Sequence, residues 1–362
     1  MAKSRIDRVL DKIKEEYGDV INPAAYYGNY DEDYVSTGLV SLDYVLGGGF
    51  PCGRITELYG PPHACKTTLG LYAIRNALDS GHNCVFIDLE SGAATLSWIK
   101  AIGISEKYLA EDSKPVFLIS QPGDGEEASE MLLELVASGE IKVIVFDSVA
   151  AATPKFELDK ALDKQVVASR ARLMARTMRK LASALNKLKL KKRKLKRNVE
   201  LPAMIFVNQE YQNISAIPWT NPHVSSGGDA LKSYSSVRLR INPAKKMVDS
   251  KTKEVYARES KWVLIKSRVS KPYFEGILRL YIADYNCYKE EGESYSFKRG
   301  EFDKLLDLKI ALCASKLAIP HSRDRLGFIK DGEEVIYDGI EKLVKDFGYE
   351  ELVKKVKEAT LF

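Results

Sequence analysis

Residues 60–68 read GPPHACKTT and carry the residue types of a loop that binds nucleotide phosphates. The common form of that loop is G-x-x-x-x-G-K-[ST], whose backbone N–H groups and following helix N-terminus surround the phosphates. Lys66 is placed to reach the β- and γ-phosphates, and Thr67 to bind Mg²⁺. Cys65, however, replaces the second glycine of the pattern. The residues expected around the phosphates are Gly60, Pro61, Pro62, His63, Ala64, Cys65, Lys66, Thr67 and Thr68.

Polar residues that end three apolar segments can complete such a site. Asp147 ends the segment KVIVFD, Glu90 ends FIDLE and Gln209 ends FVNQ. A strand-end carboxylate commonly holds the metal, directly or through water, so Thr67 and Asp147 form a predicted Mg²⁺ site. Glu90 is expected to orient and deprotonate the attacking water, with a surface carboxylate at a strand end as the alternative. Gln209 is expected to sense the γ-phosphate and to pass that signal to the segment that follows it.

The elements that must position these residues follow an alternating α/β pattern from about residue 35. Apolar segments predict strands, and helical spacing predicts the helices between them. The strands are expected at 54–60, 84–90, 142–148 and 203–209, and the helices at 66–81, 125–140 and about 167–190. Near-continuous apolar strands between helices imply a parallel sheet covered on both faces. Such sheets bind ligands at the carboxyl ends of their strands, where the polar residues fall.

Three regions are expected along the chain. Residues 1–34 hold an amphipathic helix over 5–17 and a linker; the helix docks on a neighbouring subunit or folds back on its own domain. Residues 35–285 form the α/β core. Residues 286–362 have helical patterns with little strand character and are interpreted as a small, mainly helical C-terminal domain.

Composition narrows the class of protein. The chain has 362 residues, 45% of them hydrophobic and 29% charged, with a formal net charge of +5. These values are typical of a soluble globular protein. No apolar run approaches the roughly 20 residues of a membrane helix, and the start has no secretory character, so a cytoplasmic protein without a membrane partner is expected. The five cysteines form no C-x-x-C pair, which argues against a metal site or a disulfide framework.

Several segments together resemble the RecA family of DNA recombinases in order and spacing. They are STGLVSLDYVLGGGFPCGRITELYGP, FIDLE, KVIVFDSVAAATPK, RARLMARTMRKLAS, FVNQ and SSGGDALKSYSSVRLR, between about Ser36 and Phe274. The resemblance implies a RecA-type P-loop ATPase core with a mostly parallel central sheet flanked by helices, and it fits the N-terminal helix to the family's subunit-docking helix. The replaced glycine and the C-terminus without a long acidic tail resemble phage members, which implies a bacterial cell or a phage-infected host.

The resemblance also implies an activity. Such a protein polymerises into a helical filament on single-stranded DNA with ATP and Mg²⁺ between subunits, pairs that strand with homologous double-stranded DNA and exchanges strands. Single-strand-binding and mediator proteins are expected partners. The segment LIKSRVSKPYF matches the family's Lys-x-Lys element, so Lys266 and Arg268 are expected to reach the ATP phosphates of a neighbouring subunit. With Lys66, Glu90 and Gln209 they form the expected catalytic set.

The family binds DNA through two loops, which fall here at 156–167 and 210–226. In the second loop Ile214 and Trp219 are available to wedge or stack between bases. The alternative for this polar segment is a mobile surface loop. The residues expected to contact DNA are Val167, Arg172, Arg179, Ile214, Trp219, Gly227, Gly228 and Lys232.

Three departures from the family pattern carry their own hypotheses. Cys65 should cost about 1–3 kcal/mol of backbone strain and tune ATP affinity or turnover. Its thiol, beside Lys66, is either alkylation-sensitive or inert, and the inert state is favoured. Trp98 stands in for the family's adenine-stacking tyrosine. The run NKLKLKKRKLKRN at 186–198 is either a solvated segment or a secondary contact for duplex or displaced strand.

Two alternatives to a filament-forming recombinase stay open. The first is a ring-forming helicase or translocase on the same core, which would need an arginine finger and pore loops. The second is a paralogue that binds ATP and DNA, hardly hydrolyses, and acts as a recombination mediator. Cys65 is the main support for the mediator, and the joint presence of Lys66, Thr67, Glu90, Asp147 and Gln209 argues against it.

Overall fold

The computed structural model describes residues 4–17, 33–159, 168–195, 199–212, 223–288, 294–321, 325–330 and 333–359. It divides into two compact units, Met1–Asp33 and Tyr34–Phe362. In the first unit the predicted N-terminal helix is confirmed as α1 (Arg5–Tyr17). Ser4 and Asp7 cap its start, since each side chain accepts a hydrogen bond from the other residue's backbone N–H.

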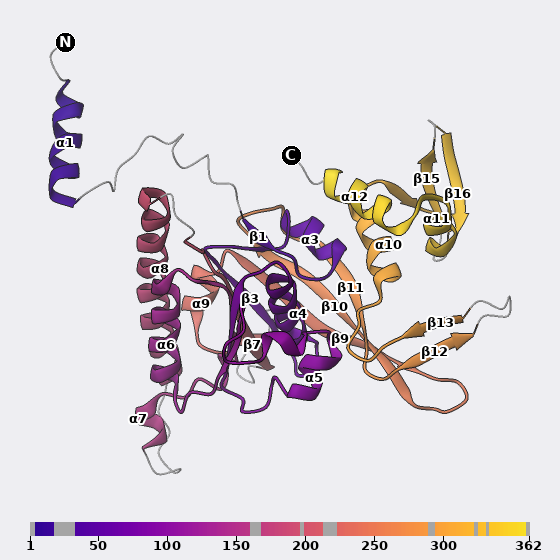
Figure 1. The fold of residues 1–362 in the computed structure, drawn as a ribbon, viewed down its shortest axis with the longest axis horizontal. Helices are drawn as coiled ribbons and strands as arrows, with labels where there is room; N and C mark the ends of the chain where they lie inside the picture. Colours follow the sequence, from indigo (N-terminus) through magenta and orange to yellow (C-terminus); the bar gives the residue numbers. More distant parts are fainter. Residues whose placement is uncertain are drawn as a thin grey trace. The chain divides into compact units, whose positions relative to one another are not determined.

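The second unit is built on a large mixed sheet (Figure 1). Along the sheet the strands follow the order β11-β10-β9-β3-β7-β6-β4-β5, and β8 pairs with β7. Pairing from β9 through β5 is parallel, whereas β9, β10 and β11 are antiparallel. The mostly parallel sheet predicted from the sequence is therefore confirmed, with an antiparallel extension at one side. The strands are β3 (Arg54–Gly60), β4 (Asn83–Asp88), β5 (Phe117–Ser120), β6 (Ile141–Asp147), β7 (Ala203–Gln212), β8 (His223–Ser225), β9 (Val237–Val248), β10 (Val255–Ser267) and β11 (Glu275–Tyr281).

Helices cover both faces of this sheet, because successive apolar side chains of each buried strand point to opposite sides. On β6, for example, Val143 and Val145 join the apolar cluster of α4, while Ile144 and Phe146 join the cluster of α6 and α8. The helices are α3 (Val40–Leu46), α4 (Lys66–Asp79), α5 (Leu96–Ala101), α6 (Gly125–Ser138), α7 (Lys155–Leu158), α8 (Ser169–Leu195) and α9 (Asp229–Tyr234). In the described part of the chain no helix is long and apolar enough to cross a membrane.

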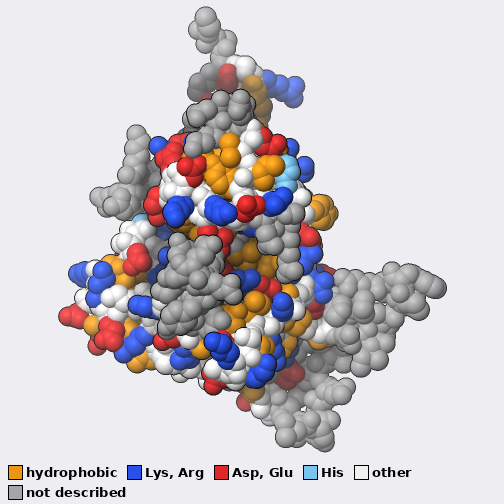
Figure 2. All heavy atoms as spheres, turned by 90° about the vertical axis from the view of Figure 1, so that its right-hand side faces the viewer, with side chains coloured by type: hydrophobic (Ala, Val, Ile, Leu, Met, Phe, Trp, Pro, Cys, Tyr) orange, Lys and Arg blue, Asp and Glu red, His pale blue; other side chains and the backbone are white. Residues whose placement is uncertain are grey.

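Short elements complete the unit at its ends. Strands β1 (Tyr34–Val35) and β2 (Phe50–Pro51) pair beside the core, and β12 (Tyr285–Tyr288) and β13 (Ser294–Phe297) form a hairpin after β11. The expected boundary between core and C-terminal domain, at 285/286, thus falls at the start of this hairpin. The face that includes the C-terminal elements mixes acidic, basic and hydrophobic side chains (Figure 2).

The C-terminal region contains more strand than its sequence suggested. Helices α10 (Lys304–Ala314), α11 (Ile340–Phe347) and α12 (Tyr349–Ala359) share an apolar cluster with an antiparallel sheet. That sheet consists of β14 (Ala318–Pro320), β15 (Arg325–Lys330) and β16 (Glu333–Asp338). The expectation of little strand character is therefore wrong. Strands of three to six residues give too short an alternation of apolar and polar side chains to stand out in sequence.

A buried carboxylate joins this region to the core. Asp307 on α10 accepts hydrogen bonds from the backbone N–H groups of Val40 (2.5 Å) and Ser41 (3.2 Å), and from the Ser41 hydroxyl. It therefore caps the start of α3 from a distant part of the chain. Burial raises the pKa of Asp307 to about 7, and the nearby Asp43 carboxylate adds to this rise.

Replacing Asp307 by Asn should change how stability depends on pH. A folded-state pKa of about 7, above the ordinary value of 3.8, means that the folded chain binds this proton more tightly than the unfolded chain. The contribution of Asp307 to the free energy of unfolding therefore falls as pH rises from 3.8 to about 7. Urea denaturation across that range should give a flatter profile for Asp307→Asn than for the wild type. An exposed control, Asp112→Asn, should keep the wild-type profile, and equal profiles for all three proteins would contradict the assignment.

Candidate nucleotide-binding and catalytic site

The phosphate loop joins β3 to α4, as the sequence predicted. At Gly60 φ is +149°, and a Cβ built there would lie 1.9 Å from the carbonyl oxygen of Ile241, so only glycine fits. Cys65 has φ +65° and ψ +18°, in the left-handed region that glycine favours. A residue with a Cβ is disfavoured there by about 1–2 kcal/mol. The strain expected at Cys65 is therefore present in the structure.

The side chain of Cys65 is held between the loop and the sheet. The Ser260 hydroxyl of β10 lies 3.9 Å from its Sγ and donates a weak hydrogen bond to it. Burial raises the pKa of the Cys65 thiol, and the neighbouring Lys66 and Arg258 cations offset this only in part. This direction favours the thiol form, which supports the inert state over the alkylation-sensitive alternative.

Lys66 begins α4 and turns its ammonium group back over the loop. Its Nζ donates to the carbonyl oxygens of Gly60 (3.0 Å) and Pro61 (2.7 Å). Burial lowers the pKa of Lys66, while the carboxylates of Asp147 and Glu90 oppose that shift. The structure thus places a buried cation beside the loop, near Asp147 at the end of β6 and Glu90 just after β4.

Thr67 and Asp147 meet as the sequence predicted. The Thr67 hydroxyl donates to Asp147 Oδ2 at 2.5 Å, and Asp147 is almost fully buried. Burial raises the pKa of Asp147 to about 7. A hydroxyl and a carboxylate at the end of a phosphate loop are the oxygen donors that Mg²⁺ prefers, so these residues fit the ion.

Glu90 and Gln209 are also brought together. Glu90 Oε1 accepts hydrogen bonds from Gln209 Nε2 (2.8 Å) and from the Ser148 hydroxyl (2.5 Å), and Glu90 is exposed to solvent. Sequence reasoning missed Ser148. The only signal for Ser148 in the sequence was its place directly after Asp147. The peptide bond between these two residues is cis in the structure. Asp88 holds the turn that carries Glu90, because it accepts from the backbone N–H groups of Glu90 and Gly92.

Gln209 also closes the second predicted DNA loop. Its carbonyl oxygen accepts from the Ser226 N–H at 3.1 Å, and β8 pairs with the end of β7. At the start of the loop, Glu210 is almost fully buried and binds Arg240 of β9 through two nitrogen atoms, at 3.2 and 2.9 Å. One residue therefore touches Glu90 with its side chain and the far end of the loop with its backbone.

A buried polar network supports this strand end, and sequence reasoning missed it as well. Glu57 on β3 is fully buried and pairs with Arg238 of β9 at 2.5 Å. Asn208 donates to Glu57 (2.9 Å) and to the carbonyl oxygen of Ser226 (2.9 Å). The only sequence signal was a carboxylate within a strand expected to be buried, because a buried carboxylate demands a partner.

The predicted DNA-contact residues differ in how far the structure describes them. Val167, Ile214 and Trp219 lie outside the described residues. Arg172 and Arg179 lie exposed on α8, and Lys232 pairs with Asp229 at 2.9 Å. Gly227 and Gly228 have φ +82° and +73°, and a Cβ on Gly227 would meet Val149 at 2.7 Å, so both glycines serve close packing.

Three further predicted site residues, Lys266, Arg268 and Trp98, contact parts of the chain other than the phosphate loop. Lys266 and Arg268 donate to backbone carbonyl oxygens at the end of α9: Lys266 to Lys232 (2.7 Å) and Ser233, and Arg268 to Ser233 (3.2 Å). Burial lowers the pKa of Lys266, and Arg268 adds to that effect. Trp98 is half-buried on α5, with the Arg299 guanidinium 5.5 Å from its ring centroid. Their roles toward ATP stay predictions.

The basic run at 186–198 is helical over most of its length, because α8 continues to Leu195. Residues 196–198 lie outside the described residues. Lys187 and Lys191 are exposed on this helix, whereas burial lowers the pKa of Lys189. Both interpretations of the run, a solvated segment or a DNA contact, stay open at this point.

The loop, its lysine and the Thr67–Asp147 pair on a mostly parallel sheet define a P-loop nucleotide-binding protein. The family model described as the RecA N-terminal domain matches residues 4–284. The protein named "Protein RecA" of Helicobacter pylori is 35% identical over 274 residues, which cover 75% of this chain and 72% of that protein. The proteins of the same name from Ehrlichia chaffeensis and Deinococcus radiodurans are each 34% identical, over 85% and 81% of this chain and 76% and 78% of their own. The chain belongs to the RecA family.

The strain at Cys65 can be tested with two substitutions. Glycine adopts a positive φ without strain, whereas alanine has a Cβ and keeps the strain. Cys65→Ala should therefore be less stable than Cys65→Gly by about 1 kcal/mol. Urea denaturation measures this difference. An alanine variant as stable as the glycine variant would show that the loop holds no such strain.

The buried pair of Glu57 and Arg238 allows a test of the supporting network. Arg238→Leu leaves a carboxylate buried without its cation and should lower the free energy of unfolding by about 3–5 kcal/mol. Glu57→Gln combined with Arg238→Leu should recover part of that loss, as measured by urea denaturation. Lys261→Leu breaks the exposed pair with Glu275 and should lose under about 1 kcal/mol. Equal losses for the buried and exposed pairs would contradict the network's role.

Proposed function

We propose that this protein is an ATP-dependent homologous recombination protein. It forms a helical filament on single-stranded DNA, pairs that strand with homologous double-stranded DNA and exchanges strands, with ATP hydrolysis stimulated by single-stranded DNA. The observation that carries the proposal is the position of Gln209, which binds the Glu90 carboxylate and also closes the loop at 210–226. Membership of the RecA family supports the same activity.

The residues of the phosphate loop bind the ATP substrate in this proposal. The loop N–H groups and Lys66 hold its phosphates, and Thr67 and Asp147 hold Mg²⁺, which offsets phosphate charge when bound. Trp98 stacks on the adenine base. Glu90, exposed at the same strand edge, orients the attacking water and accepts its proton.

Gln209 couples ATP binding to DNA binding. A change in how its side chain contacts Glu90 and the γ-phosphate is transmitted through its backbone to Ser226 and the DNA loop. The buried pair of Glu57 and Arg238 keeps β7 in place while this happens. ATP binding and DNA binding are thereby linked, and each ligand favours the other.

The DNA side and the filament complete the proposal. Arg172, Arg179 and Lys232 contact phosphates, with Val167, Ile214, Trp219, Gly227 and Gly228 as the remaining predicted contacts. Lys266 and Arg268 act on the ATP of the neighbouring subunit, and α1 docks on that neighbour. Single-strand-binding and mediator proteins are the proposed partners, and a phage-like source in a bacterial cytoplasm fits the divergent sequence.

Glu90→Gln tests the catalytic assignment. The amide cannot accept the proton, so ATP hydrolysis in the presence of single-stranded DNA should fall by about 10²–10⁴-fold. ATP binding, followed with a fluorescent analogue, should stay within a few-fold of the wild type. Glu111→Gln, at an exposed carboxylate away from the site, should hydrolyse normally.

Two results would overturn the proposed function. Absence of hydrolysis in the wild type, with and without single-stranded DNA, while filaments still form would indicate a mediator. Rings without filaments in negative-stain images would indicate a helicase or translocase. Normal hydrolysis by Glu90→Gln would remove Glu90 from the catalytic set.

A further inference from the structure

An arginine with an unsatisfied hydrogen-bond donor lies beside the phosphate loop. Arg258 on β10 is half-buried, and its Nε atom is buried and has no hydrogen-bond partner among the described residues. Glu259, the next residue, points to the opposite face of the sheet, as successive strand residues do, and binds Arg279 there at 2.7 Å. A buried donor without an acceptor is unfavourable, so a ligand that supplies an acceptor to Arg258 would gain affinity.

Arg258 faces the same side of the sheet as the phosphate loop. Ser260 lies two residues further along β10, on the same face, and its hydroxyl contacts Cys65 Sγ at 3.9 Å. The Arg258 guanidinium is close enough to oppose the rise in the pKa of the Cys65 thiol. Arg258 is therefore a neighbour of the loop residue that precedes Lys66.

Strands β9 and β10 bring Arg258 to the edge of the sheet where the loop lies. β9 runs parallel to β3, with Arg240 opposite Tyr59 near the end of β3, and then continues to Val248. β10 returns antiparallel to β9, so its first residues, Arg258 among them, lie past the level at which β3 ends. Ligands of parallel sheets bind at this carboxyl edge. Arg258 and a nucleotide held by the loop thus share one edge of the sheet.

A second cation accompanies Arg258. Lys246 on β9 is exposed and is the register partner of Arg258. The two side chains therefore point to the same face, with Cβ atoms about 4.5–5.5 Å apart. Like charges at directly opposite positions are destabilising, and an anion beside both of them offsets that repulsion. The pair has the charge that a phosphate group requires.

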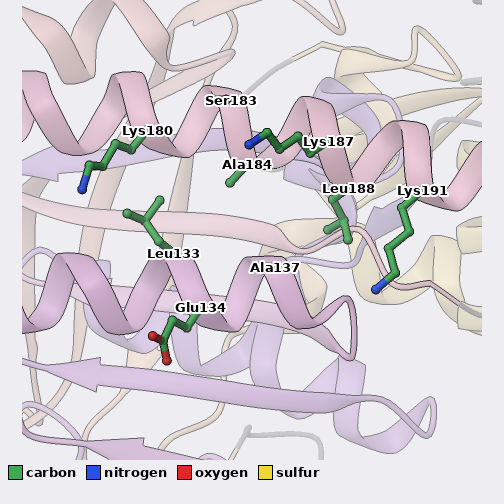
Figure 3. A pocket seen from close by; sticks show the side chains of 9 residues that line it. All are labelled: Leu133, Glu134, Ala137, Lys180, Ser183, Ala184, Lys187, Leu188 and Lys191. Atoms are coloured by element: carbon green, nitrogen blue, oxygen red, sulfur yellow. The ribbon is translucent and has the colours of Figure 1, made fainter. Parts of the chain in front are cut away.

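Another group of cations lies on a different face of the sheet. Lys180, Lys187 and Lys191 of α8 line a groove of about 450 Å³ between α6 and α8 (Figure 3). These two helices pack on one face of the sheet, whereas α4 and Cys65 belong to the apolar cluster on the other. The groove lysines therefore lie apart from the phosphate loop, whereas Arg258 is on its side of the sheet.

We propose that Arg258, assisted by Lys246, binds a phosphate group of the nucleotide held by the phosphate loop. The proposal rests on the proposed binding of ATP at that loop and adds a specific contact to it. The planar guanidinium group can donate two hydrogen bonds to one phosphate, whereas Lys246 contributes charge alone. Lys66 reaches the phosphates from α4, so Arg258 adds a contact from the sheet.

The strand order indicates which phosphate groups Arg258 can contact. Glu90 and Gln209, which face the γ-phosphate in the proposed function, belong to the ends of β4 and β7. Both strands lie on one side of β3, and β10 lies on the other. Arg258 therefore approaches the nucleotide from the side opposite the γ-phosphate groups, and its phosphate is one that ADP shares with ATP.

Displacement of a fluorescent ADP analogue from the full-length protein, without DNA, tests the proposal. Arg258→Gln should weaken binding of both ADP and ATP by about tenfold or more, since it removes charge-assisted hydrogen bonds to phosphate. Arg258→Lys keeps the charge without the paired donors, so its affinity should lie between those of the wild type and Arg258→Gln. Lys246→Gln should have the smaller effect of a few-fold. Displacement by adenosine, which has no phosphate, should be the same in all these proteins.

Two control variants accompany these measurements. Lys251→Gln makes the same charge change at an exposed position between β9 and β10, and it should bind ADP as the wild type does. Lys66→Ala removes the cation of the loop itself and should lose most ADP binding, which ties the signal to the phosphate loop. Circular dichroism melting checks that each variant is folded.

Several results would overturn the proposal. Unchanged ADP affinity in Arg258→Gln would remove Arg258 from the site and leave ATP binding at the loop intact. Equal losses of adenosine and ADP affinity would assign Arg258 to the base or ribose, and an equal loss in Lys251→Gln would show general charge attraction.

Two further results would give the arginine another occupant. Unchanged ADP affinity with a lower salt dependence of DNA binding in Arg258→Gln would make DNA the ligand. Unchanged ADP affinity with altered self-association would make Arg258 a contact between copies of this chain. Absence of ADP and ATP binding in the wild type would overturn the proposed function together with this inference, whereas the other results concern Arg258 alone.

Discussion

The parallel pairing of β4, β6, β7 and β3 is the constraint on which the candidate site depends. Its register sets Asp88 beside Asp147 and Gly60 beside Gln209, so the phosphate loop and the strand-end polar residues share one edge. Each hydrogen bond of the site is a consequence of that alignment. A shift by one residue would turn each side chain to the other face of the sheet and separate Thr67 from Asp147 and Gln209 from Glu90.

Polar groups buried in the sheet fix this register at some energetic cost. Glu57 is buried in a strand whose other side chains are largely apolar, and it is tolerated because Arg238 and Asn208 satisfy both of its oxygen atoms. Cys65 adds a second local cost, a left-handed backbone conformation that β10 supports through Ser260. The core around them, packed on both faces, supplies the stability that offsets these costs.

The sequence predicted the helices and strands whose apolar residues recur with a clear period. It also predicted the residues that belong to the phosphate-loop pattern. Strand β3 and the ends of β6 and β7 fall close to their predicted positions, and Thr67 and Asp147 meet as expected. Ser148, Arg238 and the groove between α6 and α8 could not be predicted, because they depend on which side chains face each other after packing. The C-terminal strands were missed since short strands carry little periodic signal.

We propose that ATP and single-stranded DNA together assemble this chain into a filament. Electron microscopy of the full-length protein with single-stranded DNA, Mg²⁺ and a non-hydrolysable ATP analogue tests it most directly. We expect continuous helical filaments that require both the nucleotide and the DNA strand. Rings or isolated subunits under these conditions would contradict it.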